Sequence, residues 1–126
     1  MPVTGLGDYD DANIFARILR GEIPCRKLHE DDWAFAFYDI NPQAPTHVLV
    51  IPKGRYVSHV DFAARASDAE IAGFARAVAT VARMLGLEQS GYRLLSNMGT
   101  DAGQEVPHYH VHVFGGAPLG RMIQPG

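Results

Sequence analysis

Cysteine is nearly absent from this chain, because only Cys25 occurs among its 126 residues. An internal disulfide framework is therefore excluded, and a single cysteine fits a reducing compartment. Basic residues are also too few for a broad basic surface, since 11 lysines and arginines are outnumbered by 14 aspartates and glutamates. Proteins that bind a nucleic-acid backbone usually carry such a surface, so we expect no nucleic-acid partner.

Long apolar runs are missing as well. The longest aliphatic run, Val48 to Ile51, is far too short to cross a bilayer. The first residues have neither the basic start nor the apolar core of a secretory signal. We therefore expect no membrane partner and a cytoplasmic location.

The length and the remaining composition indicate one folded domain. A chain of 126 residues has the usual size of a single domain, and its share of hydrophobic residues, 47%, is that of a globular protein. Residues 1–12 are rich in glycine and aspartate, so we expect a loose N-terminal leader there. Residues 13–126 are expected to form the domain.

Two segments have helical patterns. A short amphipathic helix is predicted from Asn13, and Gly21 is placed to end it. A longer helix is predicted after Ser67, because Ser67 and Glu70 form a capping-box pattern and Gly86 marks an end. Its apolar residues follow helical spacing: Ile71, Phe74, Val78, Val81 and Leu85.

Five segments are predicted to be strands. Residues 26–30 and 33–38 read as a hairpin that turns at Asp31 and Asp32. The nearly continuous apolar run 47–51 predicts a central strand that is buried on both faces, and residues 92–97 and 108–114 supply the last two strands. Strands on both sides of one long helix predict an α+β domain with a mainly antiparallel sheet.

Three histidines at alternate positions form the most unusual pattern: His108, His110 and His112. Side chains alternate between the faces of a strand, so these three share one face, with about 6.6–7 Å between successive members. Core burial is the ordinary explanation for a single histidine, but three on one face would each need a partner in a dry interior. A metal site is the main alternative, although no cysteine lies nearby and structural zinc sites use four ligands.

Nucleophilic catalysis is the explanation that we favour. An imidazole nitrogen can attack phosphorus when an acceptor holds the other ring nitrogen, and neighbouring histidines can carry charge or a proton for the leaving group. The preceding loop, residues 97–105, contains glycines and side-chain amides whose N–H groups suit phosphoryl oxygens. We therefore predict an enzyme that acts on phosphoryl groups with one of these histidines as the attacking group and with no metal or other cofactor.

The residues around these histidines resemble a known family. The run His108-Tyr109-His110-Val111-His112-Val113-Phe114 is similar to the signature of the histidine triad superfamily. Further segments resemble its Hint branch, the histidine triad nucleotide-binding proteins: Asn13-Ile14-Phe15, Gly21-Glu22-Ile23-Pro24, the run Asp39 to His47, Ile51-Pro52-Lys53 and Gly103-Gln104-Glu105-Val106. The resemblance extends from about Asn13 to Gly120. Two departures are Pro107, where an aromatic residue is common, and Ala102, where a glycine is common and a positive φ would be strained.

The resemblance implies a fold and an activity. The implied fold is the histidine triad fold, with a five-stranded sheet, two helices and a sheet that continues across a homodimer. The implied reaction is hydrolysis of purine nucleoside 5′-phosphoramidates, and of related aminoacyl-adenylates, to the nucleoside monophosphate AMP. The alternatives are a dinucleoside polyphosphate hydrolase of the same superfamily and a nucleotide-binding regulatory module with negligible turnover.

The resemblance also implies roles for individual residues. It puts the covalent nucleotidyl group on His110, contacts with the phosphate and the leaving group on His112, and supporting roles on His108 and His47. Ribose contacts are implied for Asp39 and Ile40. The phosphate-side residues are Asn97, Gly103, Gln104 and Glu105, the last expected to use its backbone N–H, and the apolar slot for the base is Ile14, Phe15, Ile18 and Ile23.

The helix after Ser67 also favours a homodimer. Its polar stripe is narrow and consists of Gly73, Arg76, Thr80 and Arg83. Four alanines widen the apolar surface beyond the stripe that one core requires: Ala72, Ala75, Ala79 and Ala82. High helix propensity would explain the same alanines without a partner.

Overall fold

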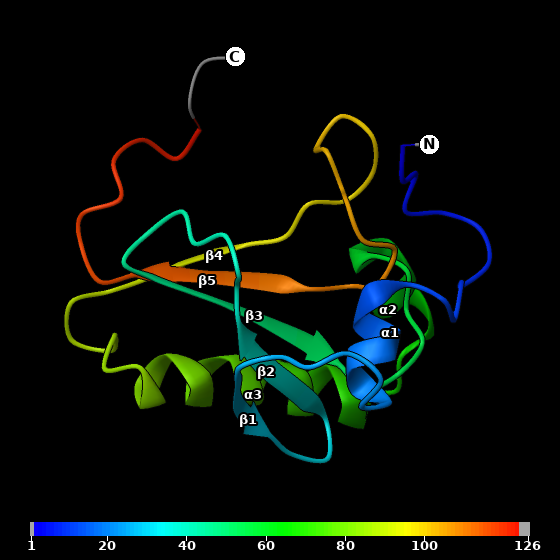
Figure 1. Cartoon of the computed structure of the whole chain (residues 1–126), viewed down its shortest axis with the longest axis horizontal. Helices are drawn as coiled ribbons and strands as arrows, with labels where there is room; N and C mark the ends of the chain where they lie inside the picture. Colours follow the sequence, from blue (N-terminus) through cyan, green and yellow to red (C-terminus); the bar gives the residue numbers. More distant parts are fainter. Residues whose placement is uncertain (1, 124–126) are drawn as a thin grey trace.

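The computed structural model describes residues 2–123, so the end of the predicted domain, residues 124–126, lies outside the described residues. Its centre is one five-stranded sheet in which every neighbouring pair is antiparallel (Figure 1). The strands follow the order β1-β2-β3-β5-β4, with these bounds: β1 Lys27–Glu30, β2 Ala34–Tyr38, β3 Thr46–Pro52, β4 Arg93–Leu95 and β5 Val111–Gly115. The expected α+β architecture with an antiparallel five-stranded sheet is confirmed.

The hairpin and the central strand form where the sequence predicts them. The Asp31 carboxylate accepts hydrogen bonds from the backbone N–H groups of Trp33 and Ala34, which closes the turn between β1 and β2. β3 lies in the middle of the sheet, and its residues from His47 to Pro52 are all buried. Both faces of β3 are covered, which is why its sequence lacks the alternation of a half-exposed strand.

Three helices, and not the predicted two, lie within the described residues. α1 (Ile14–Leu19) is capped by the Asn13 side chain, and α3 (Asp68–Met84) begins with the predicted capping box of Ser67 and Glu70. α2 (His59–Arg65) was missed because Phe62 is its only buried residue, so it has no apolar periodicity. None of the three combines the length and the apolar composition needed to cross a membrane.

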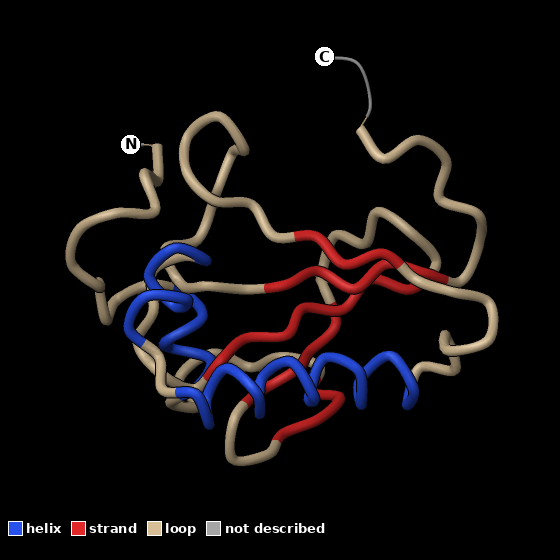
Figure 2. Tube along the Cα trace, turned by 180° about the vertical axis from the view of Figure 1, so that it is seen from behind, coloured by secondary structure: helices blue, strands red, loops and turns tan. Residues whose placement is uncertain are grey.

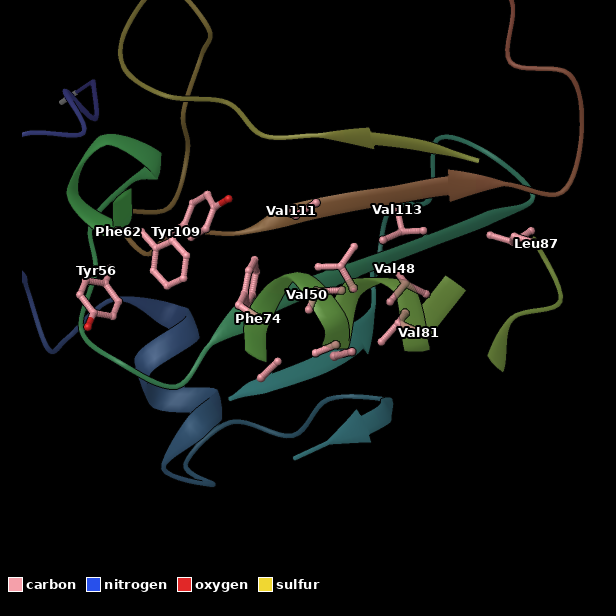
Figure 3. Packing of buried hydrophobic residues seen from close by; sticks show 14 residues of the cluster. Val48, Val50, Tyr56, Phe62, Phe74, Val81, Leu87, Tyr109, Val111 and Val113 are labelled. Atoms are coloured by element: carbon pink, nitrogen blue, oxygen red, sulfur yellow. The ribbon is translucent and has the colours of Figure 1, made fainter. Parts of the chain in front are cut away.

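α3 covers one face of the sheet and forms the larger core there (Figure 2). Figure 3 shows Phe74 and Val81 of α3 packed toward Val48 and Val50 of β3 and Val111 and Val113 of β5. Gly73 is part of this buried side and does not belong to the predicted polar stripe. A Cβ at Gly73 would lie 2.3 Å from the Trp33 indole, so the helix can approach the hairpin only with glycine there.

The other face of the sheet packs against α1. Phe15 and Ile18 of α1 lie in one cluster with Phe35, Phe37, Leu49 and Ile51, which alternate with the residues of the first core. His112 pairs with Leu49 across β3 and β5, so the predicted histidine face is this second face. The short helix α1 therefore stands beside the histidines.

Residues 2–10 contain no helix or strand, but specific contacts attach them to the domain. Gly5 is buried, and its carbonyl accepts a hydrogen bond of 2.7 Å from the Ser58 hydroxyl. Tyr9 contacts His108, and Asp11 forms two hydrogen bonds with Arg55. Composition alone predicts a free leader, whereas these specific side-chain contacts attach it to the domain.

Candidate active site

A polar cavity of about 270 Å³ opens on the face of the sheet that carries α1. Its walls come from α1, from the loop after β2, from β3, from the loop before β5 and from β5 itself. The lining residues are Phe15, Asp39, Asn41, Gln43, Leu49, Asn97, Gly103, Glu105, Val106, His110 and His112. Seven of the predicted site residues are in this set: Phe15, Asp39, Asn97, Gly103, Glu105, His110 and His112.

His110 lies in an extended segment just before β5, which begins at Val111 and not at the predicted residue 108. The backbone hydrogen bonds of β5 with its neighbours do not extend back to residues 109 and 110, because these two residues bond elsewhere. The Tyr109 N–H donates to the Tyr56 carbonyl, and the His110 carbonyl accepts from the Ser96 hydroxyl. The side chains still alternate, since Tyr109, Val111 and Val113 belong to the core under α3.

The protonation of His110 follows from its surroundings. Its Nδ1 lies 2.7 Å from the His108 carbonyl oxygen, which can only accept, so Nδ1 carries the proton. Burial lowers the pKa of His110, which keeps the ring neutral near pH 7. The Phe15 ring stands edge-on to His110 with 4.9 Å between centroids. The lone pair of His110 is therefore on Nε2, and the ring lines the cavity.

The hydrogen bond from His47 determines which ring nitrogen of His112 carries the proton. The Gln43 backbone N–H donates to Nδ1 of His47 at 3.1 Å, so the proton of the neutral His47 ring is on Nε2. That Nε2–H donates to Nδ1 of His112 at 2.9 Å. Burial is the main cause that lowers the pKa of both rings, to about 4 for His112. His112 consequently carries its proton on Nε2, as a donor.

Asp39, His47 and His112 form the one group of three possible metal ligands among the described residues. Their candidate ligand atoms lie within 4.8 Å of one another, and the Asp39 carboxylate is 3.4 Å from Nε2 of His47. A metal ion on that Nε2 would require the proton to move to Nδ1, where the Gln43 N–H already donates. The hydrogen bonds therefore suit a proton-bearing relay better than a metal site.

His108 lies behind the cavity and is completely buried. Its Nε2 is 2.9 Å from the Pro52 carbonyl oxygen and its Nδ1 is 2.5 Å from the Tyr9 hydroxyl. Burial lowers the pKa of His108 to about 4. The sequence argument against core burial of the three histidines is thus wrong for His108, which is buried with both ring nitrogens bonded.

The loop before β5 is held closed by Gln104. Its side-chain carbonyl accepts from the Gly99 N–H at 3.0 Å, and its amide donates to the carbonyls of Val57 and Val106 at 2.8 and 3.0 Å. The side chain of Gln104 is therefore used inside the protein and does not face the cavity. No residue other than glycine has a positive φ among the described residues, so Ala102 fits the loop without that strain.

Five further predicted residues lie outside the cavity wall. Ile18 is buried in the cluster under α1, and Ile23 packs against that cluster, so both support Phe15 from behind. Ile14 and Ile40 are exposed, Ile40 to 90%. His47 is buried behind His112.

Four lining residues were not predicted: Asn41, Gln43, Leu49 and Val106. Leu49 could have been found from strand register, because it lies directly opposite His112. The contribution of Gln43 is a backbone N–H, which no side-chain pattern reveals. A second, apolar cavity of about 430 Å³ lies on the opposite side of the sheet, between α2, α3 and β4, and holds none of the predicted site residues.

The chain belongs to the HIT domain family, whose profile matches residues 20–119. It is 65% identical over 118 residues to a 13.2 kDa HIT-like protein of Azospirillum brasilense, covering 94% of this chain and 97% of that protein. It is also 41% identical over 113 residues to the purine nucleoside phosphoramidase of Escherichia coli strain K12, covering 90% and 94% of the two chains.

Solved structures agree with this assignment. A HIT family hydrolase from Clostridium thermocellum matches with a TM-score of 0.79 at 35% identity, over 91% of this chain and 99% of that chain. A histidine triad protein from Clostridium difficile matches with a TM-score of 0.77 at 40% identity, over 87% and 95%. The expected histidine triad fold is confirmed, and these relatives support the expectation that the chain is an enzyme of the nucleotide hydrolase class.

Proposed function

We propose that this chain hydrolyses purine nucleoside 5′-phosphoramidates, and related aminoacyl-adenylates, through a covalent nucleotidyl group on His110. The observation that carries the proposal is the direction of the hydrogen bonds around two cavity histidines. The His108 carbonyl holds the proton of His110 on Nδ1, and His47 holds the proton of His112 on Nε2. The cavity thus has an acceptor nitrogen, which can attack phosphorus, beside an N–H donor.

In the proposed reaction, Nε2 of His110 attacks the phosphorus of the nucleotide. In a phosphoramidate the P–N bond breaks, and its electron pair goes to the nitrogen, which takes up the proton from Nε2 of His112 and leaves as the amine. In an aminoacyl-adenylate the P–O bond breaks instead, and its electron pair leaves with the carboxylate. Water then attacks the same phosphorus and gives up a proton, which restores the Nε2–H of His112 after P–N cleavage. The bond from phosphorus to Nε2 of His110 breaks, and the lone pair returns to His110. The products are the nucleoside monophosphate and the free enzyme.

Other cavity residues have separate proposed roles. Nε2–H of His112 is the donor for a phosphoryl oxygen and the leaving group. The phosphate lies toward Asn97, Gly103 and the backbone N–H of Glu105, while Asp39 and Ile40 meet the ribose. The base lies against Phe15 and Ile14. Support for this arrangement is that five of these residues line the same cavity as His110: Phe15, Asp39, Asn97, Gly103 and Glu105.

The substrate class is supported by the Escherichia coli relative that is named a purine nucleoside phosphoramidase. A reducing compartment such as the cytoplasm is the proposed location, since the lone cysteine offers no internal disulfide. No metal enters the proposed steps, because His47, His110 and His112 supply the acceptor and donors themselves.

The test is a substrate panel with the purified full chain, followed by rapid quench with a labelled nucleotide. We expect AMP from adenosine 5′-phosphoramidate and transient nucleotidyl label on His110 by mass spectrometry. Splitting of a dinucleoside polyphosphate in preference to P–N cleavage would make the chain the alternative hydrolase. AMP binding without turnover of any substrate would make it a regulatory module.

A further inference from the structure

Residues 5–11, which we call the N-terminal strap, are fixed to the domain at both ends. At one end the Ser58 hydroxyl donates to the Gly5 carbonyl in a buried hydrogen bond of 2.7 Å. At the other end the Arg55 guanidinium forms two hydrogen bonds with the Asp11 carboxylate, at 2.9 and 2.8 Å. The same guanidinium lies over the Tyr9 ring, 5.2 Å from its centroid. Tyr9 is therefore held in one place between the two attachments.

Tyr9 is bonded to the buried first histidine of the triad. Its ring stands edge-on to His108 with 5.6 Å between centroids, and its hydroxyl lies 2.5 Å from Nδ1. Because Nε2 of His108 faces the Pro52 carbonyl, which can only accept, the ring proton is on Nε2. Nδ1 of the neutral ring therefore accepts, and the Tyr9 hydroxyl donates. The bond to Pro52 sets the tautomer of His108, and the bond from Tyr9 completes it and holds the orientation of the ring.

His108 in turn holds His110 through its backbone. The His108 carbonyl accepts the Nδ1 proton of His110, which is the bond that places the lone pair on Nε2. The strap also touches the loop before β5, since a Cβ on Gly5 would lie 2.8 Å from the side-chain oxygen of Gln104. The N-terminal strap therefore contacts both His108 and the loop that contains Gln104.

We propose that Tyr9 is a positioning residue for the nucleophile, acting through His108 on His110, so that the N-terminal strap is a working part of the active site. Tyr9 precedes residues 20–119, which match the HIT domain profile, so the profile match does not itself include this contact. The inference rests on the proposed function of His110. The physical reason is that a His108 carbonyl that is not held in place would let the His110 ring turn away from its attacking orientation.

The test compares Tyr9→Phe with Tyr56→Phe in the full-length chain. Each change removes one hydroxyl that donates a hydrogen bond, since Tyr56 donates to Glu70 at 2.7 Å in the core under α3. We expect Tyr9→Phe to lower kcat for adenosine 5′-phosphoramidate about tenfold with KM within about twofold, the pattern of an interaction that matters in the transition state. Tyr56→Phe should keep the parent kcat. A parent-like kcat in Tyr9→Phe, or equal losses in both variants, would overturn the proposal.

A spectroscopic readout separates this inference from the proposed function. The ring ¹⁵N resonances of histidine report which nitrogen carries the proton, and they need no substrate. Tyr9→Phe should shift Nδ1 of His108 and also Nδ1 of His110, whereas Tyr56→Phe should shift neither. An unchanged His110 resonance would overturn the positioning role even if the parent is an active phosphoramidase. If the parent cleaves no phosphoramidate, the proposed function fails while this measurement still decides whether Tyr9 positions His110.

A second pair of variants tests whether the contact between the strap and the domain at Gly5 matters, and it leaves Tyr9 unchanged. Gly5 and Gly86 both have a φ of +74°, so alanine causes the same backbone strain at either position. Only at Gly5 would the new Cβ also meet Gln104, because nothing lies within 4 Å of the Gly86 position. We expect Gly5→Ala to lower kcat at least as much as Tyr9→Phe and Gly86→Ala to leave it unchanged. Unchanged kcat in Gly5→Ala would contradict the proposal.

Discussion

Nε2 of His47 lies 2.9 Å from Nδ1 of His112, although 65 residues separate the two histidines in the sequence. The Gln43 N–H on the far side of His47 gives this bond its direction, so His47 is the donor and His112 the acceptor. The exposed nitrogen of His112 is thereby set as an N–H donor toward the cavity. β3 and β5 are neighbours in the sheet, and that pairing brings the two rings together.

The first prediction concerns this relay. Replacing His47 with alanine removes the donor, and kcat for a phosphoramidate should fall roughly 10- to 100-fold, as with other groups that orient a catalytic ring. His47→Gln should recover much of the loss, because its terminal amide reaches the position of Nε2 and can donate to His112. Steady-state kinetics on both variants makes the comparison. Equal losses for alanine and glutamine would show that the donor at this position does not matter.

The second prediction concerns His110. His110→Ala should lose several orders of magnitude in kcat, because only binding and orientation remain when a nucleophile is removed. Affinity for AMP, measured by calorimetry, should change far less, since Asp39 and the loop amides are intact. The thiophosphoryl stereochemistry of the parent reaction should show net retention, as two in-line displacements require. Direct inversion at phosphorus, or transient label on His108 or His112, would reassign the mechanism.

The third prediction is that turnover needs no metal ion. The hydrogen bond from the Gln43 N–H keeps the proton of His47 on Nε2, where a metal would have to bind. We therefore expect the same kcat after dialysis against a strong chelator as before it. Activity that disappears with the chelator and returns with zinc would refute the proton-relay interpretation.

The fourth prediction is a homodimer that joins through β4 and α3. β4 is an edge strand, and Leu94 on it is half exposed beside the apolar cavity that Ile71 and Val78 also line. An unpaired edge next to an apolar surface suits a second copy, which would continue the sheet. Sedimentation at micromolar concentration should give a dimer for the parent chain and a shift toward monomer for Leu94→Lys.

The matched control for this prediction is Leu6→Lys. Leu6 is an exposed leucine outside the apolar cavity, so this variant adds the same charge and should remain dimeric. A parent chain that sediments as a monomer would rule out the proposed interface.

The fifth prediction is a loss of stability in mild acid. Burial lowers the pKa of His108 and of His112 to about 4, compared with about 6.5 in an unfolded chain. Between these values the unfolded state binds more protons than the folded state, so the free energy of unfolding decreases as the pH falls. The contribution of these two histidines to the free energy of unfolding should be fully present above about pH 6.5 and should be lost as the pH falls toward about 4.

Urea unfolding across this pH range measures the effect. His108→Gln keeps a donor for the Pro52 carbonyl but removes one titrating ring, so its dependence on pH should be flatter by up to about 1.4 kcal/mol per pH unit. If the free energy of unfolding of His108→Gln depends on pH as steeply as that of the parent, the lowered pKa of His108 does not cause the loss of stability in acid.

The sequence by itself determined the features that depend on neighbouring residues. The capping box at Ser67 and Glu70 forms within four residues, and the α3 core face follows from helical spacing. The continuous apolar run of β3 predicts that this strand is buried on both faces. The shared face of His108, His110 and His112 follows from the alternation of an extended chain, even though β5 begins only at Val111.

Only the tertiary structure decided which ring nitrogen carries the proton in His47, His108 and His112. That depends on Gln43, Pro52 and Tyr9, which reach the histidines through the order of the strands and the path of the N-terminal strap. The structure likewise distinguished Phe15, which lines the cavity, from Ile18, which is buried behind it on the same short helix. A hydrogen bond between distant segments leaves no periodic trace in a sequence, because its energy depends on where the two chain segments meet and not on the residues beside each partner.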